Sequence, residues 1–187
     1  MTASGKSKNS IKINTKDIAY IAMFTAIMAV CSWIAIPAAV PFTMQTFGVF
    51  LAVGVLGGKR GSLAILAYLL LGIAGVPVFA GFTGGIGRLV DTTGGYIVGF
   101  LLSALSMLAL EKLMGKRKWA LLVQMLIGLF VCYAFGTGWF MLVYANKTGE
   151  IGLITALTWC VIPYIIPDLI KIALALLLSG RLKKVCK

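Results

Sequence analysis

The stretch VIPYIIPDLIKIALALLL, residues 161–178, is apolar over a length that suits a membrane-spanning helix, yet it carries a carboxylate and an ammonium group. Asp168 and Lys171 stand three residues apart, so on a helix they share one face and partly neutralise each other. A charged side chain at the centre of a membrane helix costs about 2.5–3.5 kcal/mol on insertion scales, so such a pair indicates a functional site. The alternative is an ion pair that only holds helices together.

The composition of the whole chain indicates the same class of protein. Of 187 residues, 60% are hydrophobic and only five are acidic, and the mean hydropathy is +1.02. This apolar content far exceeds that of a soluble domain, so we predict an all-α membrane protein. We expect a polar, disordered segment over residues 1–16, a single transmembrane domain over 17–184 and a short tail over 185–187.

Six apolar runs are candidate transmembrane helices, and they cover residues 17–37, 45–57, 62–75, 93–113, 119–144 and 151–180. The second and third runs are shorter than the roughly 20 residues that a full crossing needs. They must therefore be tilted, extended into their flanking loops or partly unwound.

The basic residues predict the orientation of these helices. Apart from Arg88, Lys147 and Lys171, all of the 17 basic residues lie before the first run, between the second and third, at or after the end of the fourth, or after the sixth. By the positive-inside rule, both termini are then cytoplasmic. This charge is a topology signal, and since no basic soluble domain exists we expect no nucleic acid partner.

Several chemistries are disfavoured by what the sequence lacks. It has no histidine, and its four cysteines are scattered without a CxxC pair, which disfavours a metal site or a set of disulfides. The stretch GVLGGKRG, residues 54–61, lacks the spacing of a phosphate-binding loop, so no ATPase motif is present. We therefore expect neither an enzyme nor a protein-bound cofactor.

Polar side chains concentrate in two loops that the charge pattern places outside the cell. The segment 75–100 holds eight glycines, and its only charges are Arg88 and Asp91. Glycines expose backbone amides to a ligand, and the aromatic residues between them argue against the alternative of a flexible linker. The first loop adds Thr43 and Gln45, which both donate and accept hydrogen bonds. Two loops on one side are expected to cap a pocket, to which the second loop contributes Phe79, Phe82, Gly85, Arg88, Asp91 and Tyr96.

Three segments together resemble a known family. PYIIPDLIKIALA is similar to the PFLPGDLxKxxLA signature of BioY, the biotin-specific S component of energy-coupling factor (ECF) transporters, and DTTGGYIVGF is similar to its PTGGYLLGF. The segment from VPFTMQ to GVPVFAG resembles the family pattern PFTxQxxxVxLAGxxLGxxxGxxxxxxYLxLGxxGxPVF. The resemblance runs from Asp17 to about Lys184. Two departures are Ile166–Pro167 where the family has Pro-Gly, and Thr92 where it has proline.

The resemblance implies the S-component fold, with six helices and a vitamin pocket open to the outside. It also implies dependence on a separate membrane coupling protein and two cytoplasmic ATPase subunits, and a location in the cell membrane in contact with lipid. Biotin then meets groups of the right kind. Its ureido N–H groups suit Asp168, and its carbonyl suits Lys171, Gln45 or a backbone amide. Its carboxylate suits Arg88 or Lys171. Its thiophane ring suits apolar side chains at Phe79, Phe82, Tyr96 and Trp159.

The first run contains a face of small residues. Ala22 and Ala26 have the small-xxx-small spacing that allows helices to pack closely in lipid. The resemblance implies that this face docks the coupling protein, and the alternative is packing inside the bundle. Other functions also stay open, namely a small secondary transporter or channel acting alone, or an S component for another carboxylate-bearing vitamin. We see no inverted repeat for the first two.

Overall fold

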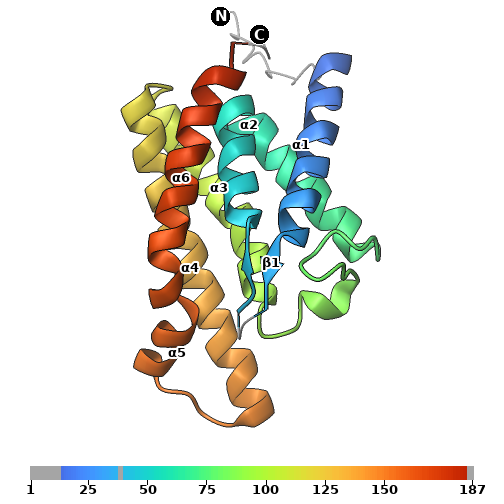
Figure 1. The fold of residues 1–187 in the computed structure, drawn as a ribbon, viewed down its shortest axis with the longest axis vertical. Helices are drawn as coiled ribbons and strands as arrows, with labels where there is room; N and C mark the ends of the chain where they lie inside the picture. The colour runs from blue at the N-terminus through green and yellow to red at the C-terminus, as the bar shows by residue number, and fades with distance from the viewer. Residues whose placement is uncertain (1–13, 38–39, 185–187) are drawn as a thin grey trace, which may run out of the picture.

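The computed structural model describes residues 14–37 and 40–184, and in these ranges nearly all of the regular structure is helical (Figure 1). The helices are α1 (Thr15–Trp33), α2 (Gln45–Ile73), α3 (Gly94–Met114), α4 (Lys118–Thr148), α5 (Leu153–Cys160) and α6 (Ile162–Leu182). The other elements are the 3-10 helix η1 (Ile86–Arg88) and two short antiparallel strands, β1 (Ala35–Ile36) and β2 (Phe42–Thr43). The all-α prediction is confirmed apart from these strands.

Helix α1 begins and ends at residues that the apolar pattern did not mark. The Asn14 side chain accepts a hydrogen bond from the Thr15 backbone, and the Asp17 carboxylate accepts one from the Asn14 backbone, so a capping box starts the helix before residue 17. The helix ends at Trp33 rather than at residue 37, because the chain turns into β1 there. The predicted disordered segment lies outside the described residues up to residue 13, and the predicted tail lies wholly outside them.

Helix α2 is divided at Gly57, which has a positive φ of 80° and non-helical geometry. The two arms fold back on each other, because a Cβ added at Gly61 would lie 2.6 Å from the Cα of Val53. Two residues eight apart on a continuous helix would be separated by roughly 12 Å along its axis. The predicted runs 45–57 and 62–75 thus correspond to these arms, and residues 58–61, expected to form a loop, are helical.

An acidic side chain holds this break in place. The Glu111 carboxylate, from the end of α3, accepts a hydrogen bond from the Gly58 backbone at the start of the second arm. It also pairs with Lys116 at 3.1 Å. Asp17, in the first turn of α1, pairs with Arg60 at 3.0 Å. The start of α1, the break in α2 and the end of α3 therefore meet at one end of the bundle.

Helices α3 and α4 pack closely because each helix has a glycine that lies against a large side chain of the other helix. A Cβ added at Gly95 would lie 2.2 Å from the Trp139 side chain, and one added at Gly136 would lie 2.3 Å from the Tyr96 ring. Any larger residue at these two positions would push the helices apart. This seam fixes the position of Tyr96, which belongs to the candidate site described below.

The predicted sixth run, residues 151–180, is split at Val161, whose backbone is not helical. The short α5 precedes the break, and Pro163 lies in the first turn of α6, where a missing N–H costs no helical hydrogen bond. Pro167 lies inside α6, one residue before Asp168. The break at Val161 therefore precedes Asp168 by about two helical turns, and Pro167 removes a backbone donor just before the charged pair.

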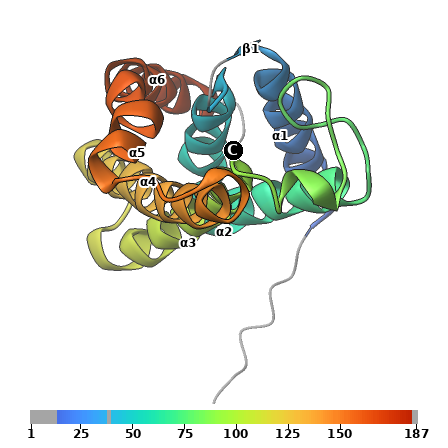
Figure 2. The ribbon, with the colours of Figure 1, turned by 90° about the horizontal axis from the view of Figure 1, so that it is seen from below.

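Five helices, α1, α2, α3, α4 and α6, are long and apolar enough to cross a membrane among the residues that the structure describes. The start of α1 and the end of α6 lie at the same end of the bundle (Figure 1). Figure 2, the view from the opposite end, places the first arm of α2 between α1 and α6. The β1–β2 pair, the loop after α2 and helix α5 lie toward that opposite end (Figure 1).

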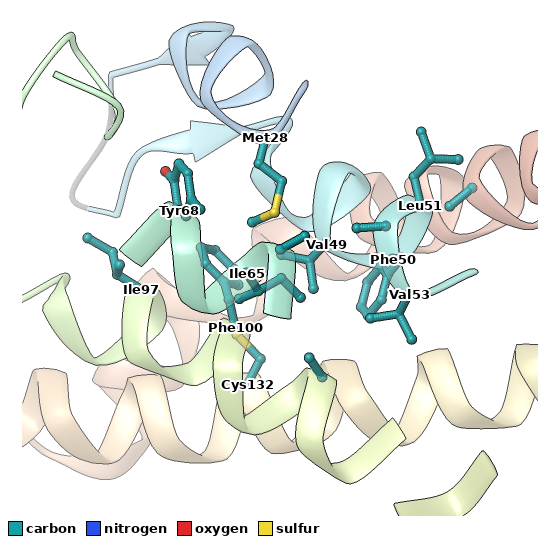
Figure 3. Close-up of a cluster of buried hydrophobic side chains, with 14 of the residues drawn as sticks. Met28, Val49, Phe50, Leu51, Val53, Ile65, Tyr68, Ile97, Phe100 and Cys132 are labelled. Atoms are coloured by element: carbon teal, nitrogen blue, oxygen red, sulfur yellow. The ribbon is translucent and has the colours of Figure 1, made fainter. Parts of the chain in front are cut away.

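The core is built mostly from side chains of α1 to α4 (Figure 3). Met28 comes from α1, Phe50 and Ile65 from the two arms of α2, and Phe100 from α3, and all four are buried. Many leucine, isoleucine and phenylalanine side chains on the outer faces are instead exposed, among them Leu70, Phe130 and Leu177. This inversion suits a bundle surrounded by lipid, where an apolar exterior has no cost.

Candidate functional site

A cavity lies between the β1–β2 region, the start of α2, the loop after α2 and helices α3 to α6. Its lining includes polar, aromatic and thiol side chains, namely Thr43, Gln45, Thr46, Phe79, Arg88, Thr93, Tyr96, Phe100, Cys132, Tyr133, Cys160, Tyr164, Asp168 and Lys171. No residue of α1 lines it. The cavity thus combines an apolar wall with a few convergent polar groups, which is typical of a small-molecule site.

Asp168 accepts hydrogen bonds from three separate elements of the fold. Its Oδ1 accepts from Lys171 Nζ at 2.7 Å and from Thr46 Oγ1 at 2.9 Å. Its Oδ2 accepts from the hydroxyl of Tyr133 at 2.5 Å. The carboxylate is almost completely buried, so these donors replace the water that a charged group would otherwise need. We call Thr43, Thr46, Tyr133, Asp168 and Lys171 the Asp168 cluster.

The ammonium group of Lys171 is equally well satisfied. It donates to Asp168, to the backbone carbonyl of Thr43 at 2.7 Å and to Thr46 Oγ1 at 3.2 Å. It also lies 4.1 Å from the centre of the Phe42 ring, a favourable cation–π geometry. The ion pair therefore joins α6 to β2 and to the start of α2, and both charges face the cavity.

Gln45 and Thr43 belong to a second hydrogen-bonded chain. The Thr43 hydroxyl donates to Gln45 Oε1, and Gln45 Nε2 donates to the Tyr68 hydroxyl at 2.6 Å. Tyr68 then donates to the carbonyl of Val78, which also accepts from Ser32. This chain connects both arms of α2 to α1 and to the following loop, so it holds the cavity wall as well as lining it.

Arg88 is the cation at the loop side of the cavity. Its Nε donates to Thr83 Oγ1 at 2.9 Å, and its guanidinium lies 3.5 Å from the Asp91 carboxylate. Asp91 also pairs with Lys147 of α4 at 2.9 Å, which ties the loop to that helix. The hydrogen bond from Lys147, then the one from the Thr92 backbone, holds the pKa of Asp91 below its ordinary value.

The remaining wall is formed by aromatic rings and thiols. Tyr96 and Thr137 share a hydrogen bond of 2.9 Å between their hydroxyl groups. Phe79 is 1% exposed and packs edge-on against Tyr68. Cys132 and Cys160 are buried free thiols that also line the cavity. This wall offers an apolar ligand ring both aromatic and sulfur contacts.

Most of the predicted site residues lie together around this cavity. Thr43, Gln45, Phe79, Arg88, Tyr96, Asp168 and Lys171 all line it, although they come from five segments of the chain. Gly85 and Asp91 do not. Gly85 shapes the loop through a positive φ of 91° and a backbone hydrogen bond to Gly72, and Asp91 pairs with Arg88, which does line the cavity.

Two aromatic residues expected at the ligand lie elsewhere. Phe82 is 64% exposed and stacks on Trp33, with ring centres 4.9 Å apart. Trp159 packs edge-on against Tyr144, and neither of these residues lines the cavity. The sequence could not separate these rings from Phe79 and Tyr96, because which way a loop or short helix turns depends on its tertiary contacts.

The sequence analysis missed Thr46, Tyr133 and Phe42. Thr46 follows Gln45 directly in the first loop, so its hydroxyl could have been recognised as a candidate ligand contact. Tyr133 is an isolated phenol in an apolar run, which is also common at membrane interfaces. Only its contact with Asp168 distinguishes it. Among the described residues, no group of three or more His, Cys, Asp or Glu side chains could hold a metal ion.

Comparisons with known proteins agree on one family. The model of the BioY family matches residues 5–187. A biotin transporter BioY of Thermotoga maritima is 41% identical over 87% of this chain and 92% of its own length. A probable biotin transporter BioY of Pyrococcus horikoshii is 38% identical over 91% of this chain and 98% of its own length.

A solved structure is similar over almost the whole fold. The crystal structure of the S-component for biotin from an ECF-type ABC transporter superposes with a TM-score of 0.80 and is 27% identical in sequence. The match covers 94% of each chain. This chain is therefore a multi-pass membrane protein with the S-component fold, and it belongs to the BioY family.

Proposed function

We propose that this protein binds biotin as the S component of an ECF-type uptake system in the cell membrane. The observation that carries the proposal is the cavity, in which the buried Asp168–Lys171 pair and the Arg88 guanidinium share an otherwise aromatic and thiol-lined wall. A ligand with a polar neutral head, an apolar ring and one carboxylate matches this combination. The biotin transporters and the biotin S-component that the chain resembles support the same choice.

Binding is proposed to need no cofactor and no chemical step. ATP hydrolysis is assigned to two cytoplasmic ATPase subunits, which act through a membrane coupling protein. The chain itself has no phosphate-binding loop of the usual spacing, since the stretch at residues 54–61 forms the break in α2. Its contribution is then capture, orientation and release of the vitamin.

We further propose six crossings with both termini in the cytoplasm. Counting the two arms of α2 separately turns the five long helices into six spans, an even number that returns the chain to its starting side. The ends of α1 and α6 at one end of the bundle support this arrangement (Figure 1). So do the basic residues at that end, among them Arg60, Lys116 and Arg181.

The face of α1 around Ala22 and Ala26 is proposed to dock the coupling protein. Both alanines are exposed, so the packing of the bundle itself leaves them free. They line an apolar groove between α1 and the second arm of α2, whose other walls include Ala67, Leu70 and Leu71. Small residues in a groove let the backbone of a partner helix approach closely in lipid.

The proposed function is tested by titrating detergent-purified protein with biotin in a calorimeter. Saturable binding of one biotin per chain is the expected result, and riboflavin and thiamine serve as control vitamins. Riboflavin has no carboxylate for Arg88, and thiamine brings a positive charge toward two cations, so neither should bind comparably. Absence of biotin binding by folded protein would contradict the proposal.

A further inference from the structure

Lys147 lies near the end of α4 and does not line the cavity, yet one carboxylate joins it to Arg88, which does. Oδ1 of Asp91 lies 2.9 Å from Lys147 Nζ, and Oδ2 lies 3.5 Å from Arg88 Nη1. We propose that Lys147 is a positioning residue that acts through Asp91. By neutralising this carboxylate, it leaves the Arg88 guanidinium available to the carboxylate of a ligand. This inference rests on the proposed biotin function.

The two contacts of the Asp91 carboxylate are unequal. Lys147 donates a hydrogen bond to it, whereas no hydrogen bond joins the side chains of Asp91 and Arg88 in the part of the chain that the structure describes. The hydrogen bond from Lys147 is also the largest cause of the lowered pKa of Asp91, and the charge of Arg88 is the smallest. Asp91 is therefore mainly the partner of Lys147.

The Arg88 guanidinium keeps most of its donors for another acceptor. It has five N–H groups, and the one on Nε donates to Thr83 Oγ1 at 2.9 Å. Among the described residues, its Nη1 and Nη2 groups donate no hydrogen bond, and the side chain lines the cavity. Thr83 thus orients the guanidinium, and the remaining N–H groups suit a carboxylate, whose two oxygens match their geometry.

The balance of charge explains why Lys147 matters to this arrangement. Two cations share one carboxylate, so the group of Arg88, Asp91 and Lys147 keeps one net positive charge. Neither cation pairs with another acidic side chain within the described ranges. Without Lys147, the charges of Arg88 and Asp91 would cancel, and a ligand carboxylate would meet a neutral pair with a negative group beside it.

A structural role for Lys147, in which it only ties the loop to α4, gives different expectations. The loop has a second tie to this helix, because the backbone carbonyl of Asp91 accepts a hydrogen bond from Trp139 Nε1 at 3.0 Å. If the side-chain tie alone mattered, Lys147→Ala and Asp91→Asn would break it alike and change binding in the same direction. If the charge matters, the two substitutions act in opposite directions on a ligand that carries a carboxylate.

The experiment measures the ratio of the affinities for biotin and for biotinol, which lacks the carboxylate, by calorimetry in detergent at low ionic strength. Lys147→Ala should lower this ratio about 2- to 5-fold, and Asp91→Asn should raise it. The double variant should return it close to the wild-type value. Lys147→Arg keeps the charge and Lys118→Ala lies at the opposite end of α4, so both should match wild type.

The path of the effect is tested in an Arg88→Ala background. There Lys147→Ala should leave the ratio unchanged, because the residue through which it acts is absent. A further fall would mean that Lys147 attracts the ligand carboxylate directly, which contradicts the inference. If Lys147→Ala cannot be purified, Lys147→Gln removes the same charge, and Asp91→Asn tests the same balance with the opposite sign.

Three results would overturn the inference while leaving the proposed function intact. They are an unchanged ratio in Lys147→Ala, a lowered ratio in Asp91→Asn, and equal affinities of the wild type for biotin and biotinol. The absence of any biotin binding by folded wild type is distinguishable from these, because it would remove the proposed function itself. Each ratio is taken within one variant, so a loss of active protein cancels.

Discussion

Asp168 and Lys171 show how a membrane protein keeps charges in its interior. Each is about 95% buried, yet every N–H of the ammonium group has an acceptor, and the carboxylate has three donors. Breaking such a pair from one side leaves the other charge unpaired, which costs several kcal/mol. The two residues are thus expected to act as one unit.

At this scale we predict that Asp168→Asn and Lys171→Ala each weaken biotin binding by about 10-fold or more, or about 1.4 kcal/mol. Asp168→Asn removes the negative charge that balances Lys171. Lys171→Ala removes the hydrogen bonds that orient Thr46 and Asp168. Calorimetry on purified variants measures the effect, with Glu150→Gln as an exposed acidic control. If both variants fold and bind biotin as tightly as the wild type, the two residues form an ion pair with a structural role only.

A second prediction concerns Arg88 and the carboxylate end of the ligand. We expect biotinol, which lacks the carboxylate, to bind wild type more weakly than biotin. The difference should largely disappear in Arg88→Ala, because the cation that the carboxylate meets is gone. A cycle of two ligands and two proteins gives the coupling energy. Equal binding of biotin and biotinol by the wild type would assign Arg88 to the Asp91–Lys147 network alone.

At the scale of the elements, the break in α2 depends on glycine. Gly61 brings the second arm against the backbone of Val53 in the first, and Gly58 brings it equally close to Leu108 of α3. A side chain at either position would meet backbone atoms, which cannot rotate away. The same break places Gln45 and Thr46 at the cavity and Tyr68 behind them.

We therefore predict that Gly61→Ala destabilises the protein by about 1–3 kcal/mol, since the added methyl group would lie 2.6 Å from the Val53 Cα. Thermal unfolding in detergent measures the change. Gly138→Ala is a matched control, because a methyl group there meets nothing within 4 Å and the residue is also helical. An equal melting temperature for wild type and Gly61→Ala would show that the arms are free to separate.

The exposed face of α1 gives a second prediction at this scale. Ala22→Trp or Ala26→Trp should abolish biotin uptake by cells that contain the coupling protein and ATPases, because the indole fills the groove against which the partner docks. Biotin affinity of the purified variants should be unchanged, since α1 does not line the cavity. If both variants lost binding as well, the face would be part of the internal packing.

At the scale of the whole molecule, charges divide the protein into two ends. The paired groups Asp17–Arg60 and Glu111–Lys116 lie at the end that holds the start of α1. The Asp91–Lys147 pair lies beyond the cavity, at the start of α3 and the end of α4. The cavity lies nearer to this second end, which agrees with the proposed capture of the ligand from outside.

The proposed topology predicts which positions react with a membrane-impermeant maleimide in intact cells. In a Cys186→Ser background the remaining thiols are buried, so labelling reports the introduced cysteine. Glu150→Cys should react from outside, whereas Lys16→Cys and Lys184→Cys should react only after permeabilisation. Reaction of Lys16→Cys and Lys184→Cys from opposite sides would show an odd number of crossings.

The local sequence was enough to predict the membrane class, the helical fold and most of the polar residues at the cavity. Burial of charge in an apolar run is costly, so Asp168 and Lys171 stood out without any structure. The glycine content of the second loop likewise singled out the segment that holds Phe79, Arg88 and Tyr96. These signals are local, because each depends on a residue and its neighbours in the chain.

What the tertiary structure decided is which of these groups lie within hydrogen-bonding distance of one another. No spacing in the sequence relates Tyr133 to Asp168, 35 residues away, or Thr46 to Lys171, 125 residues away. Phe82 and Trp159 are aromatic residues that were expected at the ligand together with Phe79 and Tyr96, but they do not line the cavity. Hydrogen bonds require partners within about 3 Å, and only the packing of α2, α4 and α6 around one another brings these partners that close.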